Sequence, residues 1–222
     1  MKRRKRRRSW VSAACVACAL EAAAPPANAS SADRSRPIGV GADLAYALPG
    51  GNLEEGSLLS DVTLGLVRLE LDGAYRWQRR FSAGLGFGYG LVLPTICGSS
   101  SDCTSSLGSD VTVNLLGRWH IGVWKSFEPD VDLDLGYEWF SSKHSDSGVT
   151  SFRSFHGIFA GVGGHAQFRL TRALSVGPVI EVSAGSFAHA SLEAPGVDVS
   201  RDTDGTAVHV WTSLGARALT TW

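Results

Sequence analysis

The chain has 222 residues and a mass of 23.5 kDa, and its 44% hydrophobic and 19% charged residues are typical of one folded domain rather than of a disordered chain. The formal net charge is zero, but residues 1–29 hold seven of the 21 bases and a single acid, which leaves 14 bases and 20 acids in the rest. This acidic body argues against a nucleic-acid partner, and no apolar run of about 18 residues follows residue 30, so we expect no transmembrane helix.

The first 29 residues have the layout of a secretory signal peptide. The basic segment Lys2–Arg8 precedes the apolar Trp10–Leu20, whose 11 residues are too few to cross a bilayer as a helix. Ala27-Asn28-Ala29 then gives an A-x-A cleavage pattern. A nucleic-acid or nuclear patch is the alternative for the arginine cluster. The sequence predicts three parts: a signal peptide at 1–29, a short N-terminal segment at 30–36 and a folded domain at 37–222.

The rest of the chain alternates between apolar and polar or small residues, which is the period-two pattern of strands with two different faces. The alternation recurs in eight segments: 37–48, 60–77, 80–93, 110–123, 130–141, 153–170, 174–186 and 206–222. Val62, Leu64 and Leu66 are out of phase with Val67, which predicts a bulge or an upper segment outside the membrane. Pro178 removes a ladder hydrogen bond inside the seventh segment, so we expect a local distortion there.

The links between these segments alternate in length. Four of them have 11 to 19 residues rich in Gly, Ser and Asp: 49–59, 94–109, 142–152 and 187–205. The others have two to six residues: 78–79, 124–129 and 171–173. Outer-membrane barrels have short periplasmic turns, long outer loops and an even number of strands. The sequence therefore predicts an all-β fold, an eight-stranded antiparallel up-and-down transmembrane β-barrel with both chain ends in the periplasm.

The two faces of the strands differ in chemistry. With the apolar face toward lipid, aromatic residues gather near both membrane surfaces, as interfacial girdles do. The predicted aromatic girdle consists of Tyr46, Tyr75, Trp77, Phe81, Tyr89, Tyr137, Trp139, Phe168 and Trp222. A soluble barrel with an apolar interior and a charged exterior is the alternative. Charges nearly vanish from one face of every strand, which favours the membrane barrel.

The second face carries glycines and charged residues of both signs. A barrel of eight strands has room only for side chains inside, so we expect a paired polar core to fill it. Asp43 lies on this face as well. The predicted lumen charge network consists of Arg68, Glu70, Asp72, Arg76, Arg80, Arg118, Asp132, Asp134, Glu138, Arg169, Glu181 and Arg217.

Cys97 and Cys103 remain after removal of a signal peptide, and they flank a short polar segment. In an exported chain this arrangement predicts a disulfide, with a pair of free thiols as the alternative. Their loop offers too few ligands for a metal, and the six histidines contain no H-x-x-x-H pair. We therefore expect neither a metal nor a cofactor.

Two adjoining segments and the last residue of the chain carry a resemblance to a known family. Segments 69–77 and 81–90, joined by a tight turn, resemble the second and third strands of the small outer-membrane barrels of the OmpA/OmpX type. Trp222 is similar to the terminal aromatic residue that those proteins present to the barrel-assembly machinery, although many of them end in Phe. The resemblance covers 37–222. It implies a Gram-negative outer-membrane protein whose partners are membrane lipids, lipopolysaccharide and that machinery.

The resemblance is specific for architecture and weak for activity, since this fold serves several functions. The sequence predicts a monomeric, non-enzymatic barrel that holds outer loops at the cell surface for adhesion or envelope integrity. A narrow pore or a transporter of small hydrophobic molecules is the alternative. A lipid A-modifying barrel enzyme is a third hypothesis, because His189, Ser191 and Glu193 supply a base, a hydroxyl and an acid.

Overall fold

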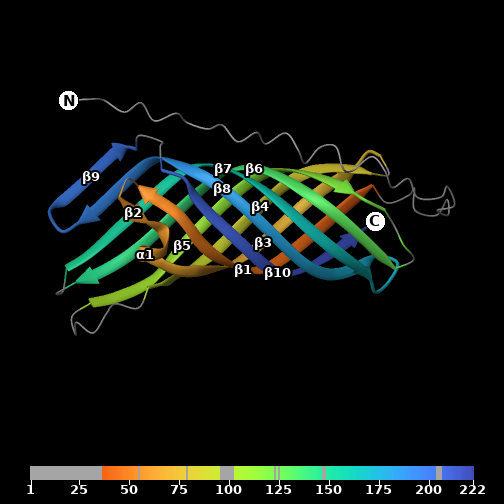
Figure 1. Ribbon diagram of the computed structural model, residues 1–222, viewed down its shortest axis with the longest axis horizontal. Helices are drawn as coiled ribbons and strands as arrows, with labels where there is room; N and C mark the ends of the chain where they lie inside the picture. Colours follow the sequence, from red (N-terminus) through yellow and green to blue (C-terminus); the bar gives the residue numbers. More distant parts are fainter. Residues whose placement is uncertain are drawn as a thin grey trace, which may run out of the picture. The chain divides into compact units, whose positions relative to one another are not determined.

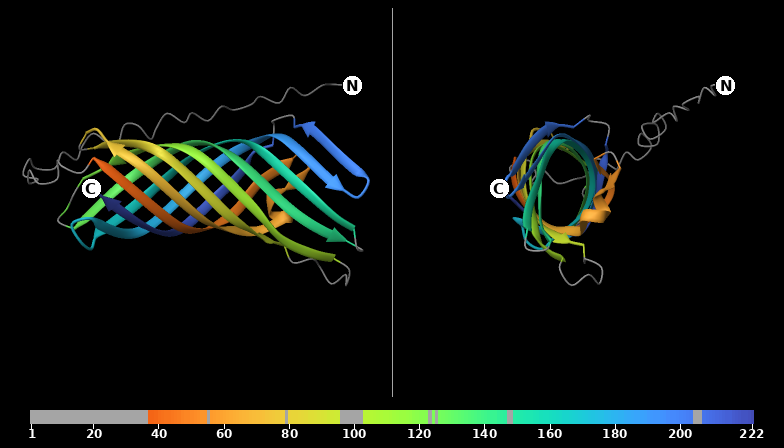
Figure 2. Two further views of the ribbon diagram at one scale, coloured as in Figure 1. Left: turned by 180° about the vertical axis from the view of Figure 1, so that it is seen from behind. Right: turned by 90° about the vertical axis from the view of Figure 1, so that its left-hand side faces the viewer.

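Eight long strands, each antiparallel to its neighbours, form a closed ring (Figure 1). They are β1 (Ile38–Glu54), β3 (Thr63–Arg76), β4 (Phe81–Pro94), β5 (Cys103–His120), β6 (Phe127–Asp146), β7 (Val149–Arg169), β8 (Leu174–Ala194) and β10 (His209–Thr221). The computed structural model describes residues 37–54, 56–78, 80–95, 103–122, 124, 126–146, 149–203 and 207–222. β10 pairs with both β8 and β1, which closes the sheet on itself, as the end-on view in Figure 2 shows. The predicted eight-stranded antiparallel barrel is confirmed.

Alternate residues of each strand face outward and into the lumen. On the outer face, Leu85, Leu133, Ile158 and Leu214 are 61–66% exposed. In water such side chains would gain by burial, whereas in a membrane barrel they contact acyl chains. The inward positions hold buried charged groups, among them Arg118. The soluble alternative, with an apolar interior and a charged exterior, is therefore wrong.

Strand β4 is rich in glycine because side chains of the next strand lie across it. A Cβ atom on Gly86 would lie 2.1 Å from Asn114 Oδ1, and one on Gly88 would lie 2.3 Å from Thr112 Oγ1. Asn114 and Thr112 are the register partners of these glycines on β5. The inward glycines thus leave space in a narrow lumen for polar side chains.

The strands continue well beyond the ends that the hydrophobic alternation predicts. β6 and β7 stay paired up to Asp146 and Val149, across most of the predicted link 142–152. The predicted link 187–205 is largely a second hairpin, in which β8 pairs with β9 (Val197–Asp202) around Gly196, whose φ is 76°. The prediction of loops in these two places is wrong. The alternation reports contact with lipid, whereas backbone pairing continues into water, where neither face has to be apolar.

The first long link folds back over the lumen at the hairpin end of the barrel. β2 (Ser57–Leu58) pairs with the end of β1, and the short helix α1 (Leu59–Val62) follows. Among the described residues, no helix is long and apolar enough to cross a membrane. Leu53 and Leu59 are 1% and 0% exposed and belong to a buried apolar cluster. This link therefore contributes to the filling of the lumen.

The two predicted irregularities are present. The register of β3 against β4 shifts between Thr63 and Gly65, so that Leu64 is exposed while Leu66, two residues further on, is buried. This is the predicted bulge. Pro178 lies where the pairing of β8 with β7 is interrupted, between Val179 and Val176, which is the predicted local distortion.

Gly86→Ala is expected to lower the free energy of unfolding by about 1–3 kcal/mol, because overpacking forces Asn114 out of place. Gly73→Ala is the matched control, since a Cβ at this strand position meets nothing within 4 Å. We expect its effect to stay within about 0.5 kcal/mol. Urea unfolding in detergent micelles measures both variants. Equal midpoints would contradict the packing of β5 side chains across β4.

Candidate functional site

Two buried arginines organise the charges in the middle of the lumen. Arg118 on β5 donates two hydrogen bonds of 2.8 and 3.0 Å to Asp132, its register partner on β6. Arg217 on β10 pairs with Asp43, its register partner on β1, at 2.5 Å. Asp72 on β3 accepts from both arginines, with Arg118 Nη2 at 3.5 Å. These ion pairs connect five strands of the ring, including the two that close it.

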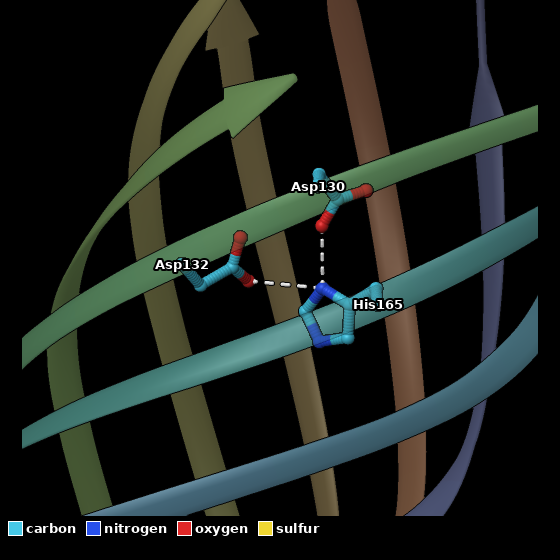
Figure 3. Close-up of side chains that lie close together, drawn as sticks. All are labelled: Asp130, Asp132 and His165. Atoms are coloured by element: carbon cyan, nitrogen blue, oxygen red, sulfur yellow. Dashed lines mark hydrogen bonds and ion pairs between the residues drawn. The ribbon is translucent and has the colours of Figure 1, made fainter. Parts of the chain in front are cut away.

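Two carboxylates and an imidazole converge next to Arg118 (Figure 3). His165 Nδ1 on β7 lies 2.6 Å from Asp130 Oδ1 and 3.3 Å from Asp132 Oδ2. Two carboxylates and an imidazole can serve together as ligands of a divalent metal ion. However, both oxygens of Asp132 already accept from Arg118, whose Nε also lies 3.6 Å from Asp130 Oδ1. A metal ion here would face a guanidinium of like charge, so we interpret the cluster as part of the ion-pair network.

Toward the hairpin end, two more acids are buried with partners. Arg68 Nη2 lies 2.6 Å from Asp110 Oδ2. Glu138 lies between two groups of β10, with His209 Nε2 at 2.7 Å and Trp211 Nε1 donating at 2.9 Å. The side chain of Glu138 is 2% exposed, so both contacts lie in the interior. Partnered in this way, the carboxylates avoid much of the cost of burial inside the barrel.

At the short-turn end of the lumen, Glu128 lies close to three basic side chains. Arg76 Nη2 lies 2.5 Å from Glu128 Oε1, and His120 Nδ1 lies 3.1 Å from the same oxygen. Arg169 Nη2 lies 3.6 Å from Glu128 Oε2, with 38% of its side chain exposed. Arg76 and Arg169, both predicted members of the network, therefore lie at its partly solvated mouth.

Four predicted members of the network have other surroundings. Arg80 is exposed at the turn between β3 and β4, which corrects its predicted place in the lumen. Glu70, Asp134 and Glu181 form no ion pair with a described residue, although Asn114 Nδ2 donates to Glu70 at 3.3 Å and to Asp134 at 2.9 Å. These three acids line a cavity of about 30 Å³, which has room for about one water molecule.

The network also holds groups that the sequence-based set leaves out. They are Asp43, Asp110, Glu128 and Asp130, together with His120, His165 and His209. Asp110 and Asp130 share the inward parity of their strands, so the alternation contains a signal for both. His120, His165 and His209 share the inward parity of their strands as well, but parity alone does not show which acid each of them meets across the lumen.

Apolar side chains fill the lumen beyond the charged layer, at the hairpin end. We call this buried cluster the aromatic plug: Ala47, Leu53, Leu59, Leu66, Val92, Phe140, Phe155, Phe187, Ala190 and Trp211. Phe140, Phe155, Phe187 and Trp211 pack with ring centroids 5.5–6.4 Å apart. The expectation of a polar core throughout the lumen is wrong for this part. Away from water, apolar side chains can pack there as they do in a soluble core.

The predicted girdle residues lie on the outer wall. At the short-turn end, Tyr75, Trp77, Phe81, Phe168 and Trp222 are exposed, as are Tyr46, Tyr89 and Trp139 at the other end. Tyr137 is half-buried, because its ring packs 4.6 Å from Trp139 and its hydroxyl bonds His156. Phe127, which the sequence-based set omits, packs against Phe168 at 5.1 Å.

Two further sets of candidate residues remain to be placed. Cys97 and the side chain of Cys103 lie outside the described residues, so the disulfide stays a prediction. Ser191 Oγ bonds Ser154 Oγ at 2.6 Å. His189 bonds residues of β9 instead. The hypothetical grouping of His189 with Ser191 and Glu193 is therefore not assembled.

Arg118→Ala is expected to cost about 3–5 kcal/mol of folding free energy, because it leaves the carboxylate of Asp132 buried without its arginine and removes one of the two arginines that bind Asp72. Arg80→Ala removes the same side chain from an exposed position, where we expect less than about 1 kcal/mol. Urea unfolding in micelles compares the two. An Arg118→Ala variant as stable as Arg80→Ala would contradict the network.

Known structures share this architecture, although no family model and no curated protein matches the chain. A major outer membrane protein from Thermus thermophilus is 14% identical, with a TM-score of 0.60 over 85% of this chain and 100% of that one. Neisserial surface protein A is 12% identical, with a TM-score of 0.53 over 83% and 97%. OprG from Pseudomonas aeruginosa is 13% identical, with a TM-score of 0.51 over 84% and 96%. The chain has the fold of the small eight-stranded outer-membrane β-barrels of the OmpA/OmpX type.

Proposed function

We propose that the protein is a closed barrel of the Gram-negative outer membrane that holds β-hairpins at the cell surface. The observation that carries this proposal is the filling of the lumen by two consecutive layers. The ion-pair network centred on Arg118 and Arg217 occupies the middle, and the aromatic plug occupies the hairpin end. A barrel filled in this way serves as an anchor.

The same filling argues against the pore alternative. Hydrated ions need a continuous water-filled path, and the cavity beside Glu70 and Glu181 measures only about 30 Å³. Beyond it, Phe140, Phe187 and Trp211 pack against one another across the lumen. Conduction would require both layers to rearrange. A small hydrophobic molecule that passed through the lumen would have to cross the ion-pair network and separate its buried charges from their partners, which is costly.

The hairpins reach well past the apolar belt. On β6, Trp139 is a girdle residue, and pairing with β7 continues for seven residues to Asp146. At about 3.3 Å per residue this extension measures about 23 Å along the strand. β8 and β9 form the second extension, with six residue pairs between His189 and Ala194. Main-chain pairing makes both surfaces stiff, which suits contact with a partner better than a flexible loop would.

The remaining partners follow from the fold. The exposed apolar wall and the girdle residues would contact membrane lipids and lipopolysaccharide, and β10 with Trp222 would be presented to the barrel-assembly machinery. The barrel needs no second copy to close, which agrees with a monomer. For the barrel body we propose no enzymatic role. The signal peptide at 1–29 would direct export.

Surface presentation can be tested by labelling single cysteines on intact cells. Val199 on β9 is exposed at the hairpin end, and Arg172 is exposed in the short turn between β7 and β8. In a chain whose Cys97 and Cys103 are replaced by Ser, we expect Val199→Cys to react with a membrane-impermeant maleimide. Arg172→Cys is the control and should react only after the outer membrane is permeabilised. Labelling of the two in the opposite order would contradict the proposed orientation.

A further inference from the structure

A serine, a histidine and an aspartate are hydrogen-bonded in series on the β8–β9 hairpin. Ser200 Oγ lies 2.6 Å from His189 Nε2, and Asp202 Oδ1 lies 2.9 Å from His189 Nδ1. A nucleophile on one ring nitrogen and a carboxylate on the other is the arrangement of a hydrolytic triad, which is recognised by geometry rather than by sequence order. We propose that Ser200, His189 and Asp202 hydrolyse carboxylic esters of membrane lipids. This rests on the proposed function, because the hairpin must stand at the membrane surface.

The register of the hairpin brings the three groups together. His189 is paired with Asp202, and Ser191 is paired with Ser200, so Ser200 lies diagonally opposite His189 on one face of the sheet. Arg201 on β9 pairs with Glu54 of β1, which ties the hairpin to the barrel. Thr203 N also donates to Ala188 O at 3.0 Å. The triad thus stands on paired strands rather than on a free loop.

A bulge in β8 decides which way His189 points. His156 pairs with His189 but Gly157 pairs with Phe187, so Ala188 is the extra residue. Phe187 is buried in the lumen. In a regular strand His189, two residues further on, would also point into the lumen. Bulges commonly redirect a side chain in this way. The bulge therefore transfers His189 from the lumen to the outer face.

The histidine ring has a second support on its other side. The rings of His156 and His189 lie 4.8 Å apart, and Tyr137 bonds His156 Nδ1 through its hydroxyl. This contact limits the rotation of His189 away from Ser200. Orientation of the base by its neighbours is what the triad chemistry needs.

The reaction uses water and no cofactor. Ser200 Oγ attacks the ester carbonyl carbon while His189 Nε2 takes its proton, and Asp202 holds the imidazolium through Nδ1–H. The tetrahedral intermediate expels the alcohol, which receives the proton from His189, and leaves an acyl group on Ser200. Water then attacks this acyl group, giving its proton to His189. Collapse releases the carboxylic acid and returns the proton to Ser200 Oγ.

The developing oxyanion needs a hydrogen-bond donor, and the backbone of β9 at Ser200 can supply one. Among the described strands β9 pairs only with β8. Because Thr203 N–H points to β8 and N–H directions alternate along a strand, the N–H groups of Ser200 and Asp202 point to the free edge. Backbone donors beside the nucleophile are a common form of oxyanion stabilisation.

The position of the triad indicates an amphiphilic substrate. The next outward pair below His156 and His189 is Ile158 with Ser186, and Ile158 is 64% exposed on the lipid-facing wall. An acyl chain lying along this wall would place its ester near Ser200. Asp202 is 93% exposed and His189 33%, so their pairing is weak in water. A lipid that covers the site would exclude water and strengthen it.

The test uses the full mature chain refolded in detergent micelles, with p-nitrophenyl laurate in mixed micelles as the substrate and a fluorophosphonate as the serine label. We expect the wild type to hydrolyse the ester and to be labelled at Ser200. Ser200→Ala should lose the label and lower the rate on the order of 10²-fold or more. Ser191→Ala is the matched control, since Ser191 lies on the same face but bonds Ser154. It should keep its rate within about two-fold.

Two further measurements separate the parts of the proposal. Asp202 acts as a positioning residue, so Asp202→Asn should lower kcat while KM stays unchanged. Faster turnover of p-nitrophenyl laurate than of the acetate ester supports the lipid class, and equal turnover overturns it. An unlabelled wild type, or equal rates for Ser200→Ala and Ser191→Ala, overturns the triad. The maleimide labelling of Val199→Cys does not depend on ester turnover, so it reports failure of the proposed function separately.

Discussion

The sharing of Asp72 between Arg118 and Arg217 is the interaction on which the interior of the barrel depends. Eight strands enclose too little space for water to solvate isolated charges, so a charge inside must find a partner there. Asp72 joins the pair at the β1–β10 closure to the pair between β5 and β6. The inward glycines of β4 are a consequence, because side chains of β5 need the space above them to enter the network.

The change from charges to aromatic rings along the lumen gives the barrel two independent closures. Glu138 lies at the boundary, where it accepts from Trp211 of the aromatic plug and bonds His209. Loss of a single ion pair would leave the plug in place, and loss of a ring would leave the charges paired. A pore would gain nothing from this arrangement, whereas an anchor for surface hairpins gains rigidity at the end where those hairpins begin. The proposed ester hydrolysis lies on the outer face of the β8–β9 hairpin and uses no group of the filled lumen.

The sequence predicts the wall of the barrel better than its interior or its ends. Lipid requires apolar residues at every second position, and this requirement is visible in segments such as 80–93. The phase slip before Val67 and the proline at 178 also mark real irregularities. The packing of Phe140 and Trp211 in the aromatic plug could not be predicted in this way. The alternation shows that a residue points into the lumen, but it does not show whether the residue contacts charged groups or aromatic rings there. The direction of His189 depends on a bulge at Ala188 that no residue pattern marks, and the contact of His189 with Ser200 depends on hairpin pairing beyond the apolar belt.

The central claim is that the lumen is closed, and single-channel recording of the refolded protein in planar lipid bilayers tests it most directly. With paired charges and the aromatic plug in place, the account predicts a baseline without discrete conductance steps. Replacement of Phe140 and Trp211 by Ala in the same chain should leave that baseline quiet, because the ion pairs of Arg118 and Arg217 remain. Stable, open-pore conductance from the wild-type chain would contradict the account.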